Sequence, residues 1–482
     1  MNLYRRLIWW YLSLPVFIFL LSWNSHIIGM PLFCGLLFAV EHVAQFSDIK
    51  KNSQINNQFN VGLIVLTVIL AVLVTWLTIV GNFSDWWKHR AIFFDLSRCE
   101  WPVNYEFNAI RHQLSFYLMY YIPPAIIAKV IGLQWLSLAV IIWTMIGYGL
   151  IFFGYFYRSR TIIEWFILLF LLVSFGGWDV LGWLWITGHW PPFGQHLATW
   201  NVFQSSSNIS VFYWVPQHVI PAWLSGVLLF HPSLQSHEKV RFGSLLVVLV
   251  AYWSPLVAIG LVFFIILDIF SLVGIRAMLN SSIIYFFSIC LIIPYYLYLS
   301  RDASLLNSGW SWRSGIDFQS YYLEFIFFTI AVLFVIVMVL VGRRVNYQYL
   351  MLTLALLLLA PFYRLGVFFD LTMRGPLVAY VYLSMAAGDG ALNLLRSCGT
   401  ADRKGKQGMG RLTLAILLLI PSGVTGLYDS IPGINALRYH STFPEYTDGV
   451  RTSIESSGYQ YQYVVPATPI KNKILLDSDV CP

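Results

Sequence analysis

Residues 60–81, NVGLIVLTVILAVLVTWLTIVG, form an apolar run without a single charged side chain. A run of this length suits a helix that crosses a hydrocarbon layer about 30 Å thick. Comparable runs recur along nearly the whole chain, and they do not fit the short alternating strands of an outer-membrane barrel. The sequence therefore predicts an all-α, polytopic integral membrane protein.

The composition leads to the same class. The chain has 482 residues, of which 58% are hydrophobic and 11% are charged, and its mean hydropathy is +0.70. These proportions exclude an ordinary water-soluble core. The formal net charge of +7 is diluted over many spans, so the expected surroundings are a lipid bilayer and no nucleic acid partner is expected.

The expected spans follow from the apolar runs. We expect about 13 transmembrane helices, with no cleavable signal and the first helix kept as an anchor. They are expected near residues 7–23, 27–45, 60–81, 134–156, 161–178, 215–231, 241–254, 256–272, 281–299, 320–341, 347–363, 375–395 and 411–427. Residues 1–427 would then be a membrane domain, and residues 428–482 a short polar tail.

The positions of the Lys and Arg residues indicate on which side of the membrane each connection lies. With the N-terminus in the cytoplasm, most cations in short connections lie on the inner side, as the positive-inside rule expects. They are Arg5/Arg6, Lys50/Lys51, Arg158/Arg160, Lys239/Arg241, Arg276, Arg343/Arg344, Arg396, Arg403, Lys404, Lys406 and Arg411. The C-terminal tail falls outside. We interpret residues 113–132 as lying along or dipping into the outer face, where the Pro123-Pro124 pair is expected to break the helix. An ordinary further span is the alternative.

The first large outer loop, residues 82–133, departs from this charge bias. It carries Lys88, Arg90, Arg98, Arg111 and Lys129. An anionic partner such as a phosphate head group explains cations on this side of the membrane.

Asp85 and His89 are the candidate catalytic residues of this loop. They are four residues apart, so they share one face if the segment is helical. A carboxylate with a neighbouring imidazole can take a proton from a hydroxyl, or the two can bind a divalent metal ion. The simpler alternative is that Asp85 only ends a helix at the water boundary.

Two further outer stretches add candidate substrate-binding residues. Residues 176–223, whose outer loop is expected at 176–214, contain seven tryptophans, which suit either an interfacial belt or stacking on sugars. Asp179, Trp214 and His218 are expected to line a shared cavity. In residues 361–376, Arg364, Asp370 and Arg374 lie between two spans, where an arginine can hold a phosphate. The alternative is that Asp370 and Arg374 only pair with each other.

The cysteines suggest no metal centre. Cys34, Cys99, Cys290, Cys398 and Cys481 form no CxxC pair and show no metal-ligand spacing. We expect them to be small packing residues.

The stretch SDWWKHRAIFFDL, followed by YYIPPAIIAK, resembles the GT-C superfamily of polytopic glycosyltransferases. In the protein-mannosylating and aminoarabinose-transferring members, an Asp-containing outer loop leads into a juxtamembrane helix with an [H/K]PPLxK-like motif. The matching residues here are Asp85, the pair Pro123 and Pro124, and Lys129. The resemblance covers the first loop and the topology. Here Asp85 is followed by Trp86 instead of a second acid, and the loop follows the third expected span instead of the first.

The resemblance implies an inverting glycosyltransferase of the bacterial inner membrane. Its donor would be a polyprenyl-phosphate sugar, and its acceptor a glycan, lipid or protein on the outer face. Asp85, with His89, would deprotonate the acceptor hydroxyl, and the cations Lys88, Arg90, Lys129, Arg364 and Arg374 would stabilise the leaving phosphate. Asp179, His218, Trp214 and Asp370 would line the substrate cavity. No cofactor is implied with certainty, and a divalent metal is left open.

Three other readings stay open. A secondary transporter for an anionic or sugar-like solute would place charges at mid-bilayer on broken helices, often repeated between two halves. An O-antigen-type polymerase or ligase shares the lipid-linked donor but lacks the early Asp loop. A non-catalytic assembly protein is the third.

Overall fold

The fold was analysed in a computed structural model of the chain. The structure describes residues 2–46, 61–80, 86–107, 110–192, 196–205, 207–231, 234–299, 308–342, 346–365, 369–398, 403–439, 446, 449–450, 464–466 and 479–481. Asp85 and the pair Arg343/Arg344 lie outside these residues.

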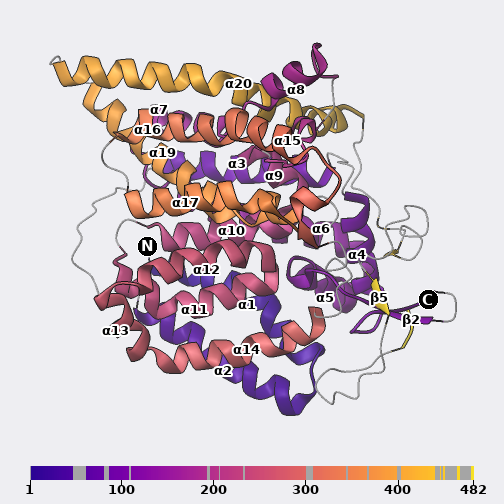
Figure 1. The fold of residues 1–482 in the computed structure, drawn as a ribbon. Coiled ribbons are helices and arrows are strands. Elements are labelled where there is room, and N and C mark those ends of the chain that lie inside the picture. Colours follow the sequence, from indigo (N-terminus) through magenta and orange to yellow (C-terminus); the bar gives the residue numbers. More distant parts are fainter. Residues whose placement is uncertain are drawn as a thin grey trace.

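The described chain is almost entirely helical, which confirms the all-α class. Its longer helices lie side by side in one bundle (Figure 1). They are α1 (Asn2–Ser22), α2 (His26–Phe46), α3 (Val61–Val80), α6 (Leu136–Phe156), α7 (Ile162–Ser174), α10 (Pro216–Leu229), α11 (Ser236–Trp253), α12 (Pro255–Ile269), α14 (Ser282–Leu299), α17 (Tyr347–Leu359), α19 (Leu377–Cys398) and α20 (Arg403–Tyr439).

Shorter elements connect them or extend them. One continuous helical segment consists of α15 (Phe318–Phe325), a π-helical stretch at Ile326–Ala331 and α16 (Val332–Val341). The other short helices are α4 (Trp86–Arg98), α5 (Ile122–Ile131), α8 (Asp179–Thr187), α9 (Asn208–Trp214), α13 (Leu272–Asn280) and α18 (Asp370–Arg374).

The number of spans is lower than expected within the described residues. Eight helical segments there are long and apolar enough to cross a membrane, or nine if the bent pair of α12 and α13 forms one span. The expected count of 13 is therefore not confirmed. One reason is length: at 1.5 Å per residue, the 14 residues of α10 cover roughly 21 Å, less than the hydrocarbon layer.

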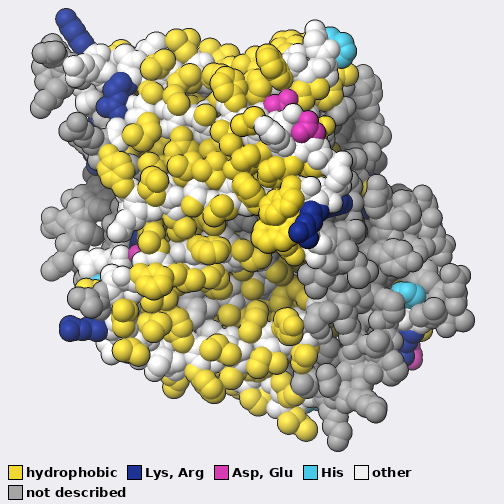
Figure 2. Space-filling view, viewed as in Figure 1, with side chains coloured by type: hydrophobic (Ala, Val, Ile, Leu, Met, Phe, Trp, Pro, Cys, Tyr) yellow, Lys and Arg dark blue, Asp and Glu magenta, His cyan; other side chains and the backbone are white. Residues whose placement is uncertain are grey.

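The outer surface of the bundle is apolar, as a bilayer requires. Along α3, Val61, Val65, Val68 and Val72 are exposed, and the opposite face is buried against other helices. Figure 2 shows a broad hydrophobic face with the Lys and Arg side chains near its margins. These observations support a multi-pass protein embedded in a membrane.

One end of the bundle holds cations that were expected on the inner side. Arg158 pairs with Asp389 at 2.5 Å, and Arg396 pairs with Glu164 at 2.8 Å. The first pair joins α19 to the connection between α6 and α7, and the second joins α19 to the first turn of α7. In Figure 1 the start of α1 lies at this end, on the left.

The opposite end carries α4, α5 and a three-stranded antiparallel sheet (Figure 1). Strands β1 (Asn104–Phe107) and β2 (Ile110–Leu114) form a hairpin, and β5 (Val464–Pro466) pairs with β2. No strand was expected here. The pairing brings part of the C-terminal tail onto the first loop.

Pro123 and Pro124 begin α5 instead of breaking a helix, because proline is tolerated in the first helical turn. With ten residues, α5 covers roughly 15 Å, which is too short to cross a bilayer. This length agrees with the juxtamembrane interpretation of the segment.

The interpretation of two cysteines was wrong. Cys99 and Cys481 form a disulfide with a Cα–Cα distance of 5.3 Å, so they link the first loop to the tail covalently. The sequence offered no local motif for the pair, because 382 residues separate the two cysteines. Cys34 and Cys290 are free thiols.

Candidate functional site

His89 lies at the end of the bundle that carries the sheet. It is fully buried on α4, its Nδ1 is 2.6 Å from the Tyr121 hydroxyl, and its Nε2 is 3.3 Å from the Trp214 carbonyl oxygen. A carbonyl only accepts, so in the neutral ring Nε2–H donates to Trp214 and Nδ1 accepts from Tyr121. These bonds fix the imidazole between α5 and the end of α9.

His218 is the second buried histidine at this end. It stands in the first turn of α10, which begins at Pro216, and its Nδ1 is 2.6 Å from the hydroxyl oxygen of Ser254, the N-cap of α12. Among the described residues, its Nε2 and the neighbouring Gln217 Oε1 are buried without a hydrogen-bond partner. Buried polar atoms in this state are rare and need an explanation such as a ligand.

Positive charge from two distant segments reaches His218. Lys88 of α4 and Arg374 of α18 lie close enough for their charges to act on its ring, as does His89. Two of the cations that the sequence assigned to a phosphate, Lys88 and Arg374, thus lie within charge range of one buried imidazole. Such an arrangement suits an anionic group.

Arg374 is positioned by its own short helix. Its Nη1 lies 2.5 Å from Asp370 Oδ1, one turn earlier on α18. A side chain on Gly260 of α12 would collide with the Gly375 carbonyl oxygen, so glycine at that position allows the close approach of α12 to the end of α18. The expected Asp370–Arg374 pairing is therefore present at the site.

The other expected phosphate-binding cations have different contacts. The Lys129 ammonium donates to the Cys99 carbonyl oxygen and lies over the Trp101 ring. Arg90 is within charge range of Tyr446 in the tail, and burial lowers the pKa of both Lys129 and Arg90 from their ordinary values. Arg364 lies over the ring of Phe369, the residue before α18.

Asp179 belongs to a second group of buried polar residues. It is buried at the start of α8, where its Oδ1 accepts from the Trp200 indole N–H at 2.9 Å. The residue before it is fixed by the π-helical stretch, because the Trp178 N–H donates to the Phe328 carbonyl oxygen at 2.8 Å. Asp179 Oδ2 has no hydrogen-bond partner among the described residues.

The neighbours of Asp179 are His196 and Asp429, whose charges act on it. Asp429 is buried on α20, its Oδ1 lies 3.2 Å from His196 Nδ1, and its Oδ2 accepts from the Ser210 hydroxyl. Sequence reasoning assigned no role to His196, Asp429 or Tyr121. Asp429 stands just beyond an expected span end, a position where an acidic residue is itself a signal of function.

Trp214 connects the two clusters. Its carbonyl oxygen binds His89, and its indole ring lies against the His196 ring with centroids 4.5 Å apart. On one side are Lys88, Arg374 and two histidines, and on the other are two carboxylates and a third histidine. Trp214 therefore stands between a positively charged part and a negatively charged part of the site.

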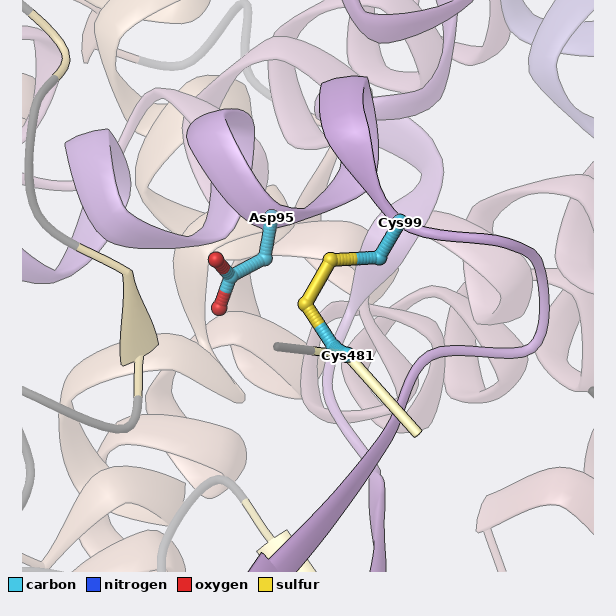
Figure 3. A group of neighbouring side chains, drawn as sticks. All are labelled: Asp95, Cys99 and Cys481. Atoms are coloured by element: carbon cyan, nitrogen blue, oxygen red, sulfur yellow. A yellow bond between two sulfur atoms is a disulfide. The ribbon is translucent and has the colours of Figure 1, made fainter. Parts of the chain in front are cut away.

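A third group joins Asp95 of α4 to Cys99, the residue after α4, and to Cys481 in the tail. Ligand atoms of Asp95, Cys99 and Cys481 all lie within 4.8 Å of one another, the only such group of three or more among the described residues. Figure 3 shows the Asp95 carboxylate beside the disulfide, on the same side of α4. Because the two sulfurs are bonded to each other, they are not thiolate ligands, and this group does not suit a metal ion.

The tail packs on this side of α4. Asp95 Oδ2 accepts from the Val450 N–H at 2.7 Å and from the Tyr105 hydroxyl at 2.9 Å. The Tyr446 ring contacts the Phe93 ring edge to face. Burial raises the pKa of the Asp95 carboxyl above its ordinary value, although both hydrogen bonds and Arg98 oppose this shift.

Comparison with known proteins identifies no relative: no family model, no curated protein and no solved structure matches the chain.

Proposed function

We propose that this protein is a membrane glycosyltransferase that moves a sugar from a polyprenyl-phosphate donor to an acceptor on the outer face of the membrane. The acceptor is a glycan, a lipid or a protein. One observation carries the proposal: the buried His218, which lies within charge range of Lys88 and Arg374, has an Nε2 without a hydrogen-bond partner among the described residues. A phosphate oxygen at this point would accept a hydrogen bond from the imidazole and would be attracted by both cations.

The position of the site supports a lipid-linked substrate. Helix α4, which carries Lys88 and His89, lies at one end of the apolar helix bundle (Figure 1), where a prenyl chain can stay in the bilayer while its phosphate reaches the protein. Lys88 and His89 come from the same turn of α4, and α5 holds His89 through Tyr121.

In the proposed reaction, the acceptor oxygen attacks the anomeric carbon of the donor sugar. The bond between that carbon and the phosphate oxygen breaks, and polyprenyl phosphate leaves with the electron pair. Asp85, the residue directly before α4, takes the acceptor's proton, and Lys88 and Arg374 stabilise the negative charge that develops on the phosphate. His89 keeps α4 in place, and no step requires a metal ion.

The disulfide supports the proposed orientation. Disulfides persist in oxidising compartments and are rare in the bacterial cytoplasm, so Cys99 and Cys481 favour a first loop and a tail outside the cytoplasm. Arg158 and Arg396, which join α6, α7 and α19 at the other end, fit a cytoplasmic inner face. The membrane we propose is the bacterial inner membrane.

The test uses the purified full-length protein in lipid nanodiscs with a panel of radiolabelled polyprenyl-phosphate sugars and an envelope extract as acceptor. The wild type should transfer label, and Asp85→Asn should lose transfer while it keeps its thermal stability. Full transfer by Asp85→Asn would disprove its role as base. Solute uptake into proteoliposomes without transfer would instead favour a transporter, and transfer of only preassembled glycans would favour a polymerase or ligase.

A further inference from the structure

The buried acidic cluster on the second side of Trp214 has no role in the reaction described above. It contains Asp179, His196, Trp200 and Asp429, with the Ser210 hydroxyl on Asp429. Asp179 and Asp429 are each 2% exposed. Two carboxylates within charge range of each other, beside one histidine, are costly to bury, and such groups near a membrane are by default functional.

A purely structural network would satisfy its own hydrogen bonds. Asp429 does so through His196, the Leu197 N–H and Ser210. Asp179 does not: Trp200 donates to Oδ1, and Oδ2 lacks a partner among the described residues. An acceptor left over in this way requires a donor from outside the network.

The chemistry of the cluster restricts what that donor can be. Carboxylates repel a phosphate and accept hydrogen bonds from hydroxyl groups. The ligand is therefore neutral and rich in hydroxyls at this point, and tryptophan rings beside carboxylates are suited to sugars. Across Trp214 the sign of the charge reverses, with Lys88 and Arg374 near His218.

We infer that the cluster of Asp179, His196 and Asp429 is a sugar subsite, in which Asp179 Oδ2 accepts a hydrogen bond from a ring hydroxyl of the donor. This inference rests on the proposed function. The phosphate end of the donor lies with Lys88, Arg374 and His218, the sugar lies with the carboxylates, and Trp214 stands between them.

The local packing keeps Asp179 ready for such a ligand. A Cβ on Gly182, one turn along α8, would lie 2.6 Å from the Trp200 ring. Glycine at this position lets the indole lie against α8 and direct its N–H to Asp179 Oδ1. This bond leaves Oδ2 as the atom that meets the ligand.

Binding measurements separate the two halves of the site. The probes are farnesyl phosphate and farnesyl phosphates that carry mannose, glucose or galactose, titrated into nanodisc-embedded full-length protein with tryptophan fluorescence as readout. Wild type should bind at least one sugar-bearing probe about tenfold more tightly than farnesyl phosphate, as expected for one or two added hydrogen bonds to a charged group.

Asp179→Asn should remove most of this preference and leave the affinity for farnesyl phosphate unchanged. Arg374→Ala should weaken all probes together. Asp389→Asn, at the other end of the bundle, is the matched control. It should change neither the affinity for farnesyl phosphate nor the preference for the sugar-bearing probe. A second variant, Trp200→Phe, keeps the ring but lets Asp179 reorient, so it should reduce the preference even if Asp179→Asn does not fold.

The inference is overturned if Asp179→Asn and Trp200→Phe both keep the wild-type preference for the sugar-bearing probe. It is equally overturned if these variants weaken the binding of farnesyl phosphate as much as the binding of the sugar-bearing probe. It is also overturned if wild type shows no such preference. A preference lost in Asp179→Asn, in a wild-type protein that transfers no sugar, would keep the subsite and reject only the proposed reaction.

Discussion

His89 Nδ1 and the Tyr121 hydroxyl lie 2.6 Å apart although 32 residues separate them in the chain. The bond joins α4, which also carries Lys88, to α5. It therefore connects the helix that carries Lys88 and His89 directly to the N-terminal end of α5.

Tyr121→Phe should loosen this connection. The ring keeps its contact with Phe93, but a buried imidazole nitrogen loses its partner, which costs about 1–3 kcal/mol of unfolding free energy. We expect a lower thermal midpoint and weaker binding of farnesyl phosphate, measured in nanodiscs. Tyr120→Phe is the control, because it removes a comparable bond to Thr144 away from His89. Equal loss of binding in both variants would contradict a role of His89 in positioning Lys88.

Arg374→Ala should weaken the binding of farnesyl phosphate. Hydrogen bonds to a charged group contribute about 1.5–3 kcal/mol, so we expect a Kd that rises by roughly tenfold to a hundredfold, with a weaker dependence on salt. Arg374→Lys keeps the charge but loses the planar guanidinium group, so its Kd should lie between those of wild type and Arg374→Ala. Arg276→Ala, on an exposed residue of α13, tests for a general charge effect. A Kd that Arg374→Ala leaves unchanged would remove this arginine from the phosphate site.

The Cys99–Cys481 bond predicts a covalent attachment that survives cleavage of the chain between them. We expect a protease site introduced near residue 472 to release a C-terminal epitope on denaturing gels only after reduction. Cys34→Ser should behave as wild type, because Cys34 is a free thiol, and Cys99→Ser should release the epitope without reductant. Release from the unreduced wild type would show that the bond is absent.

The pH dependence of stability should include a contribution from Asp95. Its folded-state pKa is raised above the ordinary value of 3.8 by burial. The carboxyl therefore stabilises the fold fully below the unfolded-state pKa, and this contribution is lost as the pH rises through the raised folded-state pKa.

Asp95→Asn should abolish this part of the pH dependence. Both hydrogen bonds end on Oδ2, so an amide oxygen can accept them without a buried charge. Thermal midpoints measured between about pH 4 and pH 8 should fall less steeply in Asp95→Asn than in wild type. Identical slopes would show that Asp95 titrates with an ordinary pKa.

The proposed orientation predicts which positions an impermeant thiol reagent reaches in intact cells. In a background without the free thiols, Cys34→Ser and Cys290→Ser, Arg313→Cys should react before permeabilisation and Arg276→Cys only afterwards. Both side chains are exposed, so accessibility depends on the side of the membrane. The opposite pattern would place the first loop and its disulfide in the cytoplasm.

The sequence was most informative where a property is local. The apolar run at 61–80 is a helix with one lipid-facing side, because hydrophobicity alone determines that a segment enters the bilayer. The number of spans was harder to predict from the sequence, because α10 ends after 14 residues and hydropathy alone does not show where a helix ends.

The site was predictable only in part, because it depends on contacts between distant segments. The charges of Lys88 and Arg374 suggested phosphate binding, but nothing in their spacing indicated that both would reach His218. His196 and Asp429 are 233 residues apart; each looked unremarkable alone, and only packing of α20 against the Trp-rich segment pairs them. The small sheet was missed for the same reason, since β5 completes it from the tail.

The link between residues 99 and 481 also sets an order of events during synthesis. The loop that contains α4 and β2 emerges from the ribosome before most of the helices, whereas the strand and the cysteine that complete it follow α20. Until they arrive, β2 has an open edge and Cys99 an unpaired thiol, the state in which strands associate wrongly. The end of the bundle that carries the sheet therefore begins to form early in synthesis and is among the last parts to be finished.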